Sequence, residues 1–139
     1  MKTTIKQITA EETWSLRHKV MWPNESIDYI KLPEDNYGVH FGLFKKQLLV
    51  SVISLFIKND TAQFRKLATL ISEQNHGYGG QLLDYIINYS SSKEIKTLWC
   101  NARKEKIQFY EKRGLLKTPE EFSKGGIDYV ILTKQITNH

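Results

Sequence analysis

A glycine-rich turn between a strand-like and a helix-like segment constrains this chain more than any other feature. The turn reads Gln-Asn-His-Gly-Tyr-Gly-Gly over residues 74–80; Thr61 to Ile71 before it has the pattern of a strand, and Gly79 to Ser90 that of a helix. Glycine lets the main chain approach a ligand closely because it has no Cβ. The first amides of a helix lack an internal partner and lie at the positive end of its dipole. The turn therefore predicts a binding site for a pyrophosphate-bearing ligand.

Two well-known phosphate loops do not fit this turn. The nucleoside-triphosphate loop ends in Gly-Lys-Ser/Thr, whereas Gln81 follows the last glycine here. The dinucleotide fingerprint needs a further glycine at the position that Leu82 occupies. The pattern that remains is Gln-x-x-Gly-x-Gly, formed by Gln74, Gly77 and Gly79.

This pattern resembles the acetyl-coenzyme A signature of the GCN5-related N-acetyltransferase (GNAT) family, Gln/Arg-x-x-Gly-x-Gly/Ala. In that family a strand ending in a Leu-Ala-Val-like triplet comes first, and Leu67-Ala68-Thr69 stands five residues before Gln74. The family's second landmark is an asparagine followed by a helix with Phe-Tyr-x-Lys-x-Gly-Phe, which Asn101 and the segment Phe-Tyr-Glu-Lys-Arg-Gly-Leu (109–115) resemble. The resemblance extends loosely over nearly the whole chain and is sharpest from Phe64 to Leu115.

The resemblance implies an α/β fold: one GNAT domain over residues 1–139, with a mixed, mostly antiparallel, splayed central sheet flanked by helices. The sequence patterns predict strands at 3–8, 39–44, 48–57, 61–71, 95–100 and 127–135, helices after Thr9 and at 79–90 and 102–113, and a short helix plus a loop within 24–36. Thr9 and Glu12 are expected to form a capping box, Gly114 to close the helix at 102–113, and a loop containing Gly125-Gly126 to precede the last strand. In the family the sheet opens between the strands predicted at 61–71 and 95–100, and the cofactor's pantetheine arm enters there.

The same resemblance implies roles for individual residues. An amide within Leu67–Thr69 would polarise the thioester oxygen, the amides of 75–80 would hold the pyrophosphate, and Asn101 would hold the pantetheine arm. Tyr110 would give the departing sulfur its proton, although a tyrosine considered alone is more often a core aromatic. The cofactor-binding residues expected in this way are Leu67, Ala68, Thr69, Gln74, Asn75, His76, Gly77, Tyr78, Gly79, Gly80, Asn101 and Tyr110.

The general base is the least defined part of this site. Many relatives have a glutamate on the strand before the triplet, whereas Phe64-Arg65-Lys66 stands there in this chain. His40 is the first substitute because an imidazole titrates near neutral pH, although a lone histidine is more often structural. A water chain, Glu73 and Asp35 are the alternatives. Acidic residues within 24–36 are candidates for recognising an amine.

Composition limits the other functions. The formal net charge is +5, and the segment from Asn101 to Lys117 contains six basic residues but only two acidic ones. A solvated helix face, contacts to the phosphates of coenzyme A, and nucleic-acid binding would each explain this segment, but no nucleic-acid recognition motif supports the last. The lone Cys100 excludes an internal disulfide and a multi-cysteine metal site. With no apolar run long enough for a membrane span and no secretory leader, a cytoplasmic protein is expected.

The function implied is that of an acyltransferase, which moves an acetyl group from acetyl-CoA, its co-substrate, to a primary amine of a small molecule or peptide by direct attack. The alternative is a non-catalytic acyl-CoA-binding module of the same fold. The expected partners are acetyl-CoA and an amine acceptor, with no membrane and no metal; nucleic acid is disfavoured, and a homodimer is left open.

Overall fold

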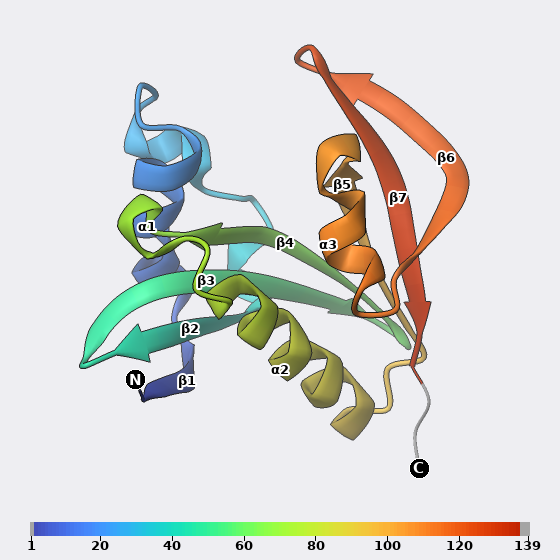
Figure 1. Ribbon diagram of the computed structural model, residues 1–139, viewed down its shortest axis with the longest axis horizontal. Coiled ribbons are helices and arrows are strands. Elements are labelled where there is room, and N and C mark those ends of the chain that lie inside the picture. Colours follow the sequence, from blue (N-terminus) through green and yellow to red (C-terminus); the bar gives the residue numbers. More distant parts are fainter. Residues whose placement is uncertain (1, 137–139) are drawn as a thin grey trace. The chain divides into compact units, whose positions relative to one another are not determined.

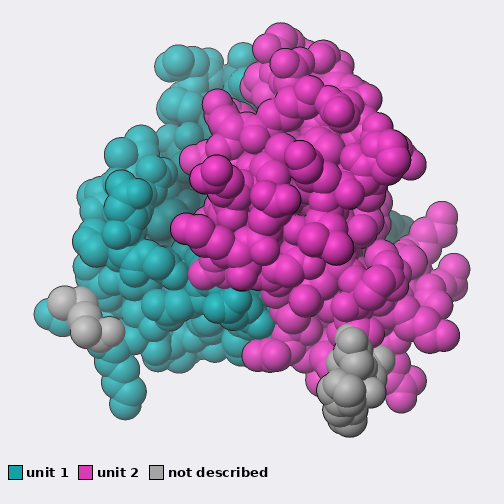
Figure 2. All heavy atoms as spheres, turned by 45° about the vertical axis from the view of Figure 1, so that its right-hand side comes forward, with its two compact units in different colours: residues 1–56, 65–86 teal, residues 57–64, 87–139 magenta. Residues whose placement is uncertain are grey.

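The computed structural model describes residues 2–136 and forms two compact units (Figure 2). The first unit comprises residues 1–56 and 65–86, and the second comprises residues 57–64 and 87–139. Strand β3 (Leu48–Lys58), strand β4 (Thr61–Thr69) and helix α2 (Tyr78–Ser92) each contribute residues to both units.

In the first unit, the remaining elements precede β3 or follow β4 (Figure 1). They are β1 (Thr3–Ile8), α1 (Ala10–Met21), the short 3-10 helices η1 (Ile27–Ile30) and η2 (Asp35–Tyr37), β2 (Val39–Lys45), and the 3-10 helix η3 (Ile71–Glu73). Strands β1 and β2 pair antiparallel from Thr3–Lys45 to Ile8–His40. Strand β2 also pairs antiparallel with β3, with an irregularity between Leu43 and Phe44.

Helix α1 begins where the sequence predicts it. The Glu12 amide donates to the Thr9 hydroxyl oxygen at 3.2 Å, and the Thr9 amide donates to the Glu12 carboxylate at 3.0 Å, so the predicted capping box is confirmed. The helix buries Leu16 in a cluster with Val52 of β3 and Ala68 of β4. Removing this apolar surface from water holds α1 in the first unit.

The second unit contains the C-terminal strands. They are β5 (Thr97–Arg103), β6 (Leu116–Lys124) and β7 (Ile127–Gln135), with the 3-10 helix η4 (Lys104–Lys106) and the short helix α3 (Ile107–Glu111) between β5 and β6. Strand β7 pairs antiparallel with β5, from Thr97–Gln135 to Arg103–Tyr129, and with β6 on its other edge. Figure 1 shows β6 and β7 as a long hairpin.

The strands form a seven-stranded sheet in the order β1-β2-β3-β4-β5-β7-β6. Strands β4 and β5 are parallel and pair over Thr61–Gln63 and Thr97–Trp99, whereas the β1–β2, β2–β3, β5–β7 and β6–β7 pairs are antiparallel. The predicted α/β class with a mixed, mostly antiparallel sheet is confirmed. Within residues 2–136, no helix is long and apolar enough to cross a membrane.

Two expectations about the C-terminal half were wrong. Residues 116–124 form strand β6, where the sequence predicts a loop, because this strand is almost wholly exposed and lacks the apolar alternation of a half-buried strand. Its Pro119 lies where the β6–β7 register shifts, a position at which a missing amide is tolerated. The helix predicted from Ala102 begins at Ile107, because Ala102 and Arg103 still pair with β7.

Candidate active site

The glycine-rich turn before α2 uses left-handed main-chain conformations. Asn75 has φ 67° and Gly77 has φ 82°, a region that asparagine and glycine adopt at lower cost than other residues. The Gln81 amide donates to the Gly77 carbonyl at 3.0 Å, so the amides of Tyr78 and Gly79 precede this helical bond. A Cβ placed on Gly77 would meet no atom within 4 Å. The turn therefore presents open main chain at the start of a 15-residue helix.

Short-range contacts hold this turn. The Glu73 amide donates to the Leu70 carbonyl at 2.8 Å, and the Gln74 side-chain amide donates to the Thr69 carbonyl at 3.1 Å. Lys45 at the end of β2 forms an ion pair with Glu73, and this hydrogen bond raises the pKa of Lys45. The signature glutamine thus ties the turn to the end of β4, where the Leu-Ala-Thr triplet lies.

The triplet lies beyond the part of β4 that pairs with β5. Lys66, directly before it, has φ 59°, a left-handed residue that interrupts the regular course of the strand. The Ser51 hydroxyl on β3 lies 3.1 Å from the Ala68 carbonyl and 2.7 Å from the Thr69 hydroxyl. The Leu70 amide donates to the Val50 carbonyl at 2.9 Å. Strand β3 therefore fixes the triplet from one side.

Tyr110 lies on α3 in the second unit, among aromatic rings. Its ring centroid is 5.7 Å from that of Phe64 and 5.1 Å from that of Phe109. Burial raises the pKa of Tyr110, the nearby Cys100 adds to the increase, and Arg103 partly opposes it. The phenol therefore carries its proton at neutral pH, as a proton donor must.

The structure also shows two other predicted features, the glycine that ends α3 and the landmark Asn101. Gly114 has φ 90° and the Leu115 amide donates to the Tyr110 carbonyl at 3.3 Å, which confirms the predicted glycine closure of this helix. Asn101 is an exposed residue of β5, opposite Ile131 of β7, rather than a residue after the strand.

Cys100 is a buried residue of β5. Its side chain is free of any disulfide and only 2% exposed. Burial raises the pKa of the thiol from 9.0 to about 12, so almost no thiolate is present at neutral pH. These properties agree with a small core side chain and disfavour a covalent nucleophile.

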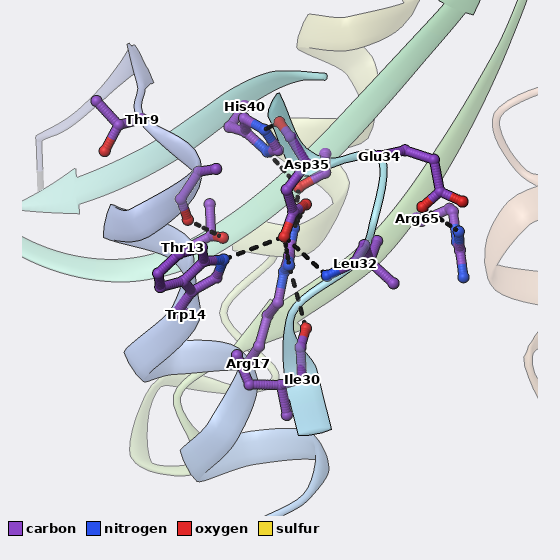
Figure 3. A network of polar contacts seen from close by, with 12 residues as sticks. Thr9, Thr13, Trp14, Arg17, Ile30, Leu32, Glu34, Asp35, His40 and Arg65 are labelled. Atoms are coloured by element: carbon purple, nitrogen blue, oxygen red, sulfur yellow. Dashed lines mark hydrogen bonds and ion pairs between the residues drawn. The ribbon is translucent and has the colours of Figure 1, made fainter. Parts of the chain in front are cut away.

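His40 lies in a buried polar network in the first unit and is only 3% exposed (Figure 3). Its Nδ1 lies 2.7 Å from the Ser54 hydroxyl, and its Nε2 lies 2.9 Å from the Asp35 carbonyl oxygen. The Ser54 hydroxyl also accepts a hydrogen bond from Arg17 at 2.8 Å, so its own proton is available for donation to Nδ1. The His40 proton then lies on Nε2, which donates to the Asp35 carbonyl oxygen. Both ring nitrogens are engaged, so the structure does not support His40 as the general base.

Arg17 and Asp35 form the centre of the same network. Arg17 is fully buried; its Nη1 and Nη2 donate to the two Asp35 carboxylate oxygens at 2.8 and 2.9 Å, and Nη1 also donates to the Ile30 carbonyl at 3.2 Å. The Trp14 indole and the Leu32 amide donate to Asp35 as well, at 3.1 and 3.0 Å. Burial alone would raise the pKa of Asp35, but the hydrogen bonds from Arg17, Leu32 and Trp14 outweigh it and lower the pKa. Asp35 is therefore an ionised structural group and is also unsuited to be the base.

Sequence reasoning missed this network, although it contained a signal. Arg17 stands next to Leu16 on α1, at helical spacing from Trp14 and Met21, and so lies on the side of the helix that carries apolar residues. A charged residue there needs a buried partner of opposite charge. The partner could not be chosen among the four acids of 24–36 without the fold.

The predicted site residues fall into two groups. The triplet Leu67–Thr69, the turn 74–80 and His40 belong to the first unit, and Asn101 and Tyr110 belong to the second. Within the first unit, the Gln74–Thr69 hydrogen bond joins triplet and turn, whereas His40 belongs to the separate network around Arg17.

Comparison with known proteins agrees with this geometry. The family model of the acetyltransferase (GNAT) domain matches residues 5–136. The uncharacterized N-acetyltransferase YitI of Bacillus subtilis (strain 168) is 27% identical over 142 residues, which cover 95% of each chain. A crystal structure from Lactobacillus plantarum superposes with a TM-score of 0.86 at 20% identity, covering 99% of this chain and 100% of the other. A GNAT acetyltransferase from Elizabethkingia anophelis with acetyl-CoA bound superposes with a TM-score of 0.75 at 22% identity, covering 96% and 97%.

The mixed sheet and the glycine turn between β4 and α2, taken with the matching family model, identify the chain as an acyltransferase. The chain belongs to the GNAT acetyltransferase family. The family resemblance in the sequence and the enzyme class inferred from it are both confirmed.

Proposed function

We propose that this protein transfers the acetyl group of acetyl-CoA to a primary amine of a small molecule or peptide, acting as one domain over residues 1–139. The observation that carries the proposal is the open turn at Gly77, whose left-handed main chain leads into α2. Amides there suit a diphosphate because they precede the first helical bonds and lie at the positive end of the helix dipole. The Elizabethkingia relative, solved with acetyl-CoA, supports the choice of co-substrate.

The other site residues have defined tasks in this proposal. Amides of 75–80 hold the diphosphate, and the main chain of Leu67–Thr69 pairs with the pantetheine arm as an added strand would. One of these triplet amides donates to the thioester oxygen and stabilises the charge that develops on it. Asn101 donates to the arm from β5. Gln74, which donates to the Thr69 carbonyl, keeps turn and triplet in fixed relation.

The proton transfers follow from the bonds that change. The amine nitrogen attacks the thioester carbon, the carbon–sulfur bond breaks, and the sulfur leaves as a thiolate that takes the Tyr110 proton. The attacking nitrogen loses its own proton. Because His40 and Asp35 are buried and engaged, we assign that proton to water, and water returns a proton to the Tyr110 phenolate. His40 then has a positioning role, joining β2, β3 and η2.

Production of free thiol tests this function. We expect the purified protein to release CoA thiol from acetyl-CoA only when a primary amine is present, with a mass increase of one acetyl group on that amine. A non-catalytic acyl-CoA-binding module, the alternative that the family comparison does not favour, would bind acetyl-CoA without amine-dependent thiol release.

A cytoplasmic location, favoured by the single cysteine, belongs to the same proposal.

A further inference from the structure

Three of the four acids expected to recognise a cationic acceptor lie next to cations of the chain itself. Asp35 is buried on Arg17, the Asp28 carboxylate lies 2.9 Å from the Lys31 ammonium, and Glu34 faces Arg65. A carboxylate already neutralised in this way attracts a cationic substrate weakly. These three acids therefore give no net support for an acceptor chosen by its positive charge.

Arg65 has a different character. It lies on β4, two residues before the triplet and directly before the left-handed Lys66. Its side chain is one-third exposed and extends toward Glu34, in the loop beside the Arg17 network (Figure 3). The nearest carboxylate oxygen of Glu34 is 3.8 Å from Nη1, longer than a normal hydrogen bond, and the Glu34 side chain is 53% exposed. A guanidinium held only by a loose, solvated pair can exchange its partner readily.

The Arg17 network holds the segment that carries Glu34. Glu34 directly precedes Asp35, whose carboxylate accepts hydrogen bonds from Arg17, Trp14 and the Leu32 amide. Glu34 is thereby anchored through its neighbour, and it orients Arg65 without saturating its donors. Arginine suits carboxylate and phosphate groups because its planar fork donates two parallel hydrogen bonds.

We infer that Arg65 determines acceptor specificity: the acceptor is a primary amine that also carries an anionic group, a carboxylate or a phosphate, which Arg65 binds. The inference rests on the proposed function, because it takes the triplet as the place of the thioester. The substrate's anionic group binds Arg65, and its amine extends along β4 toward Leu67. This arrangement fits a compact substrate in which the two groups are a few bonds apart. Arg65 binds the acceptor and takes no part in bond making.

Paired substrates test this inference. Glycine is compared with glycinamide, and phosphoethanolamine with ethanolamine, on the wild type, Arg65→Gln and Arg65→Lys. We expect Arg65→Gln to lower kcat/KM about 10-fold or more for the anionic members, mainly through KM, with a change of less than about 3-fold for the neutral ones. Arg65→Lys should restore part of the loss. Comparing each substrate across variants cancels differences in amine basicity.

The outcomes separate the alternatives. A response of the glycine pair alone assigns a carboxylate, and a response of the phosphoethanolamine pair alone assigns a phosphate. Equal losses for anionic and neutral members in Arg65→Gln overturn the inference while leaving acetyl transfer intact. Lys96→Gln removes a similarly loose surface cation, 3.9 Å from Asp60, and should leave all four substrates unchanged.

A binding measurement distinguishes a failure of this inference from a failure of the proposed function. Calorimetric titration of the CoA-saturated protein with glycine and with phosphoethanolamine detects the Arg65 contact without turnover. Affinity lost in Arg65→Gln but kept in Lys96→Gln supports the inference. Absence of any Arg65-dependent binding or turnover overturns it, whereas failure of the proposed function is a failure to bind acetyl-CoA itself.

Discussion

Replacing Tyr110 with phenylalanine should lower kcat by about 100-fold or more, because removing a general acid forfeits its share of the rate. Phenylalanine keeps the ring contacts with Phe64 and Phe109 and removes only the hydroxyl. Affinity for acetyl-CoA should therefore change little. Steady-state thiol release gives kcat, and calorimetry on the same variant gives the dissociation constant.

Two controls sharpen this result. Tyr129 also has a ring partner in the second unit, Phe122 at 5.1 Å, and lies on β7; Tyr129→Phe should leave kcat unchanged. A thioester with a more acidic leaving thiol depends less on the general acid, so Tyr110→Phe should lower its kcat less. A Tyr110→Phe variant with wild-type kcat would remove Tyr110 from the mechanism and leave the rest of the site as proposed.

Replacing Asp35 with asparagine should lower the free energy of unfolding by about 3–5 kcal/mol, because it leaves the Arg17 guanidinium buried without a counter-charge. Urea denaturation followed by tryptophan fluorescence measures this, since Trp14 itself donates to Asp35. The surface pair Lys31–Asp28 is the matched control, and Asp28→Asn should cost less than about 1 kcal/mol. An Asp35→Asn variant as stable as Asp28→Asn would contradict the account of the network.

A double replacement distinguishes the charge from the packing. In Arg17→Met/Asp35→Leu both charges are removed and apolar groups fill the space, so much of the stability should return. If Asp35→Asn does not fold, recovery of folding in the double variant still identifies the uncompensated charge as the cause. A double variant less stable than Asp35→Asn would show that the polar network itself holds the 27–37 segment.

The same carboxyl gives stability a defined dependence on pH. In the unfolded chain Asp35 takes its proton near 3.8, whereas the network lowers its pKa in the folded protein. The contribution is therefore complete above the unfolded value and is lost as pH falls below about 3.8 toward the folded one. Asp35→Asn should show a smaller loss of stability over this acid range than the wild type.

The sequence located the glycine-rich turn, the proposed cofactor-binding element, because that turn depends on local chemistry. The glycine turn requires main-chain conformations that few residues adopt, and Asn75 and Gly77 have them. The capping box at Thr9 and the closing Gly114 are local in the same sense, and both are confirmed. Helix α2 begins within one residue of its expected start because it follows the turn directly.

The features that could not be predicted depend on contacts between distant segments. The hydrogen bonds of Arg17 to Asp35 and to Ser54 join α1, η2 and β3, and no spacing in the sequence encodes them. The same network engages both ring nitrogens of His40, a residue chosen as the base for its chemistry alone. Strand β6 was missed because it pairs through its main chain while its side chains stay in solvent.

The proposed binding of acetyl-CoA to the main chain of the 75–80 turn is most directly measured by isothermal titration with acetyl-CoA and with S-acetylpantetheine, which carries the same thioester arm but lacks the diphosphate and the adenosine 3′-phosphate attached to it. If the turn's amides grip the diphosphate, acetyl-CoA binds about 100-fold or more tightly than the truncated compound, since each charged hydrogen bond contributes about 1.5–3 kcal/mol. Equal affinity for the two compounds, or no binding of acetyl-CoA by the folded protein, would contradict the account.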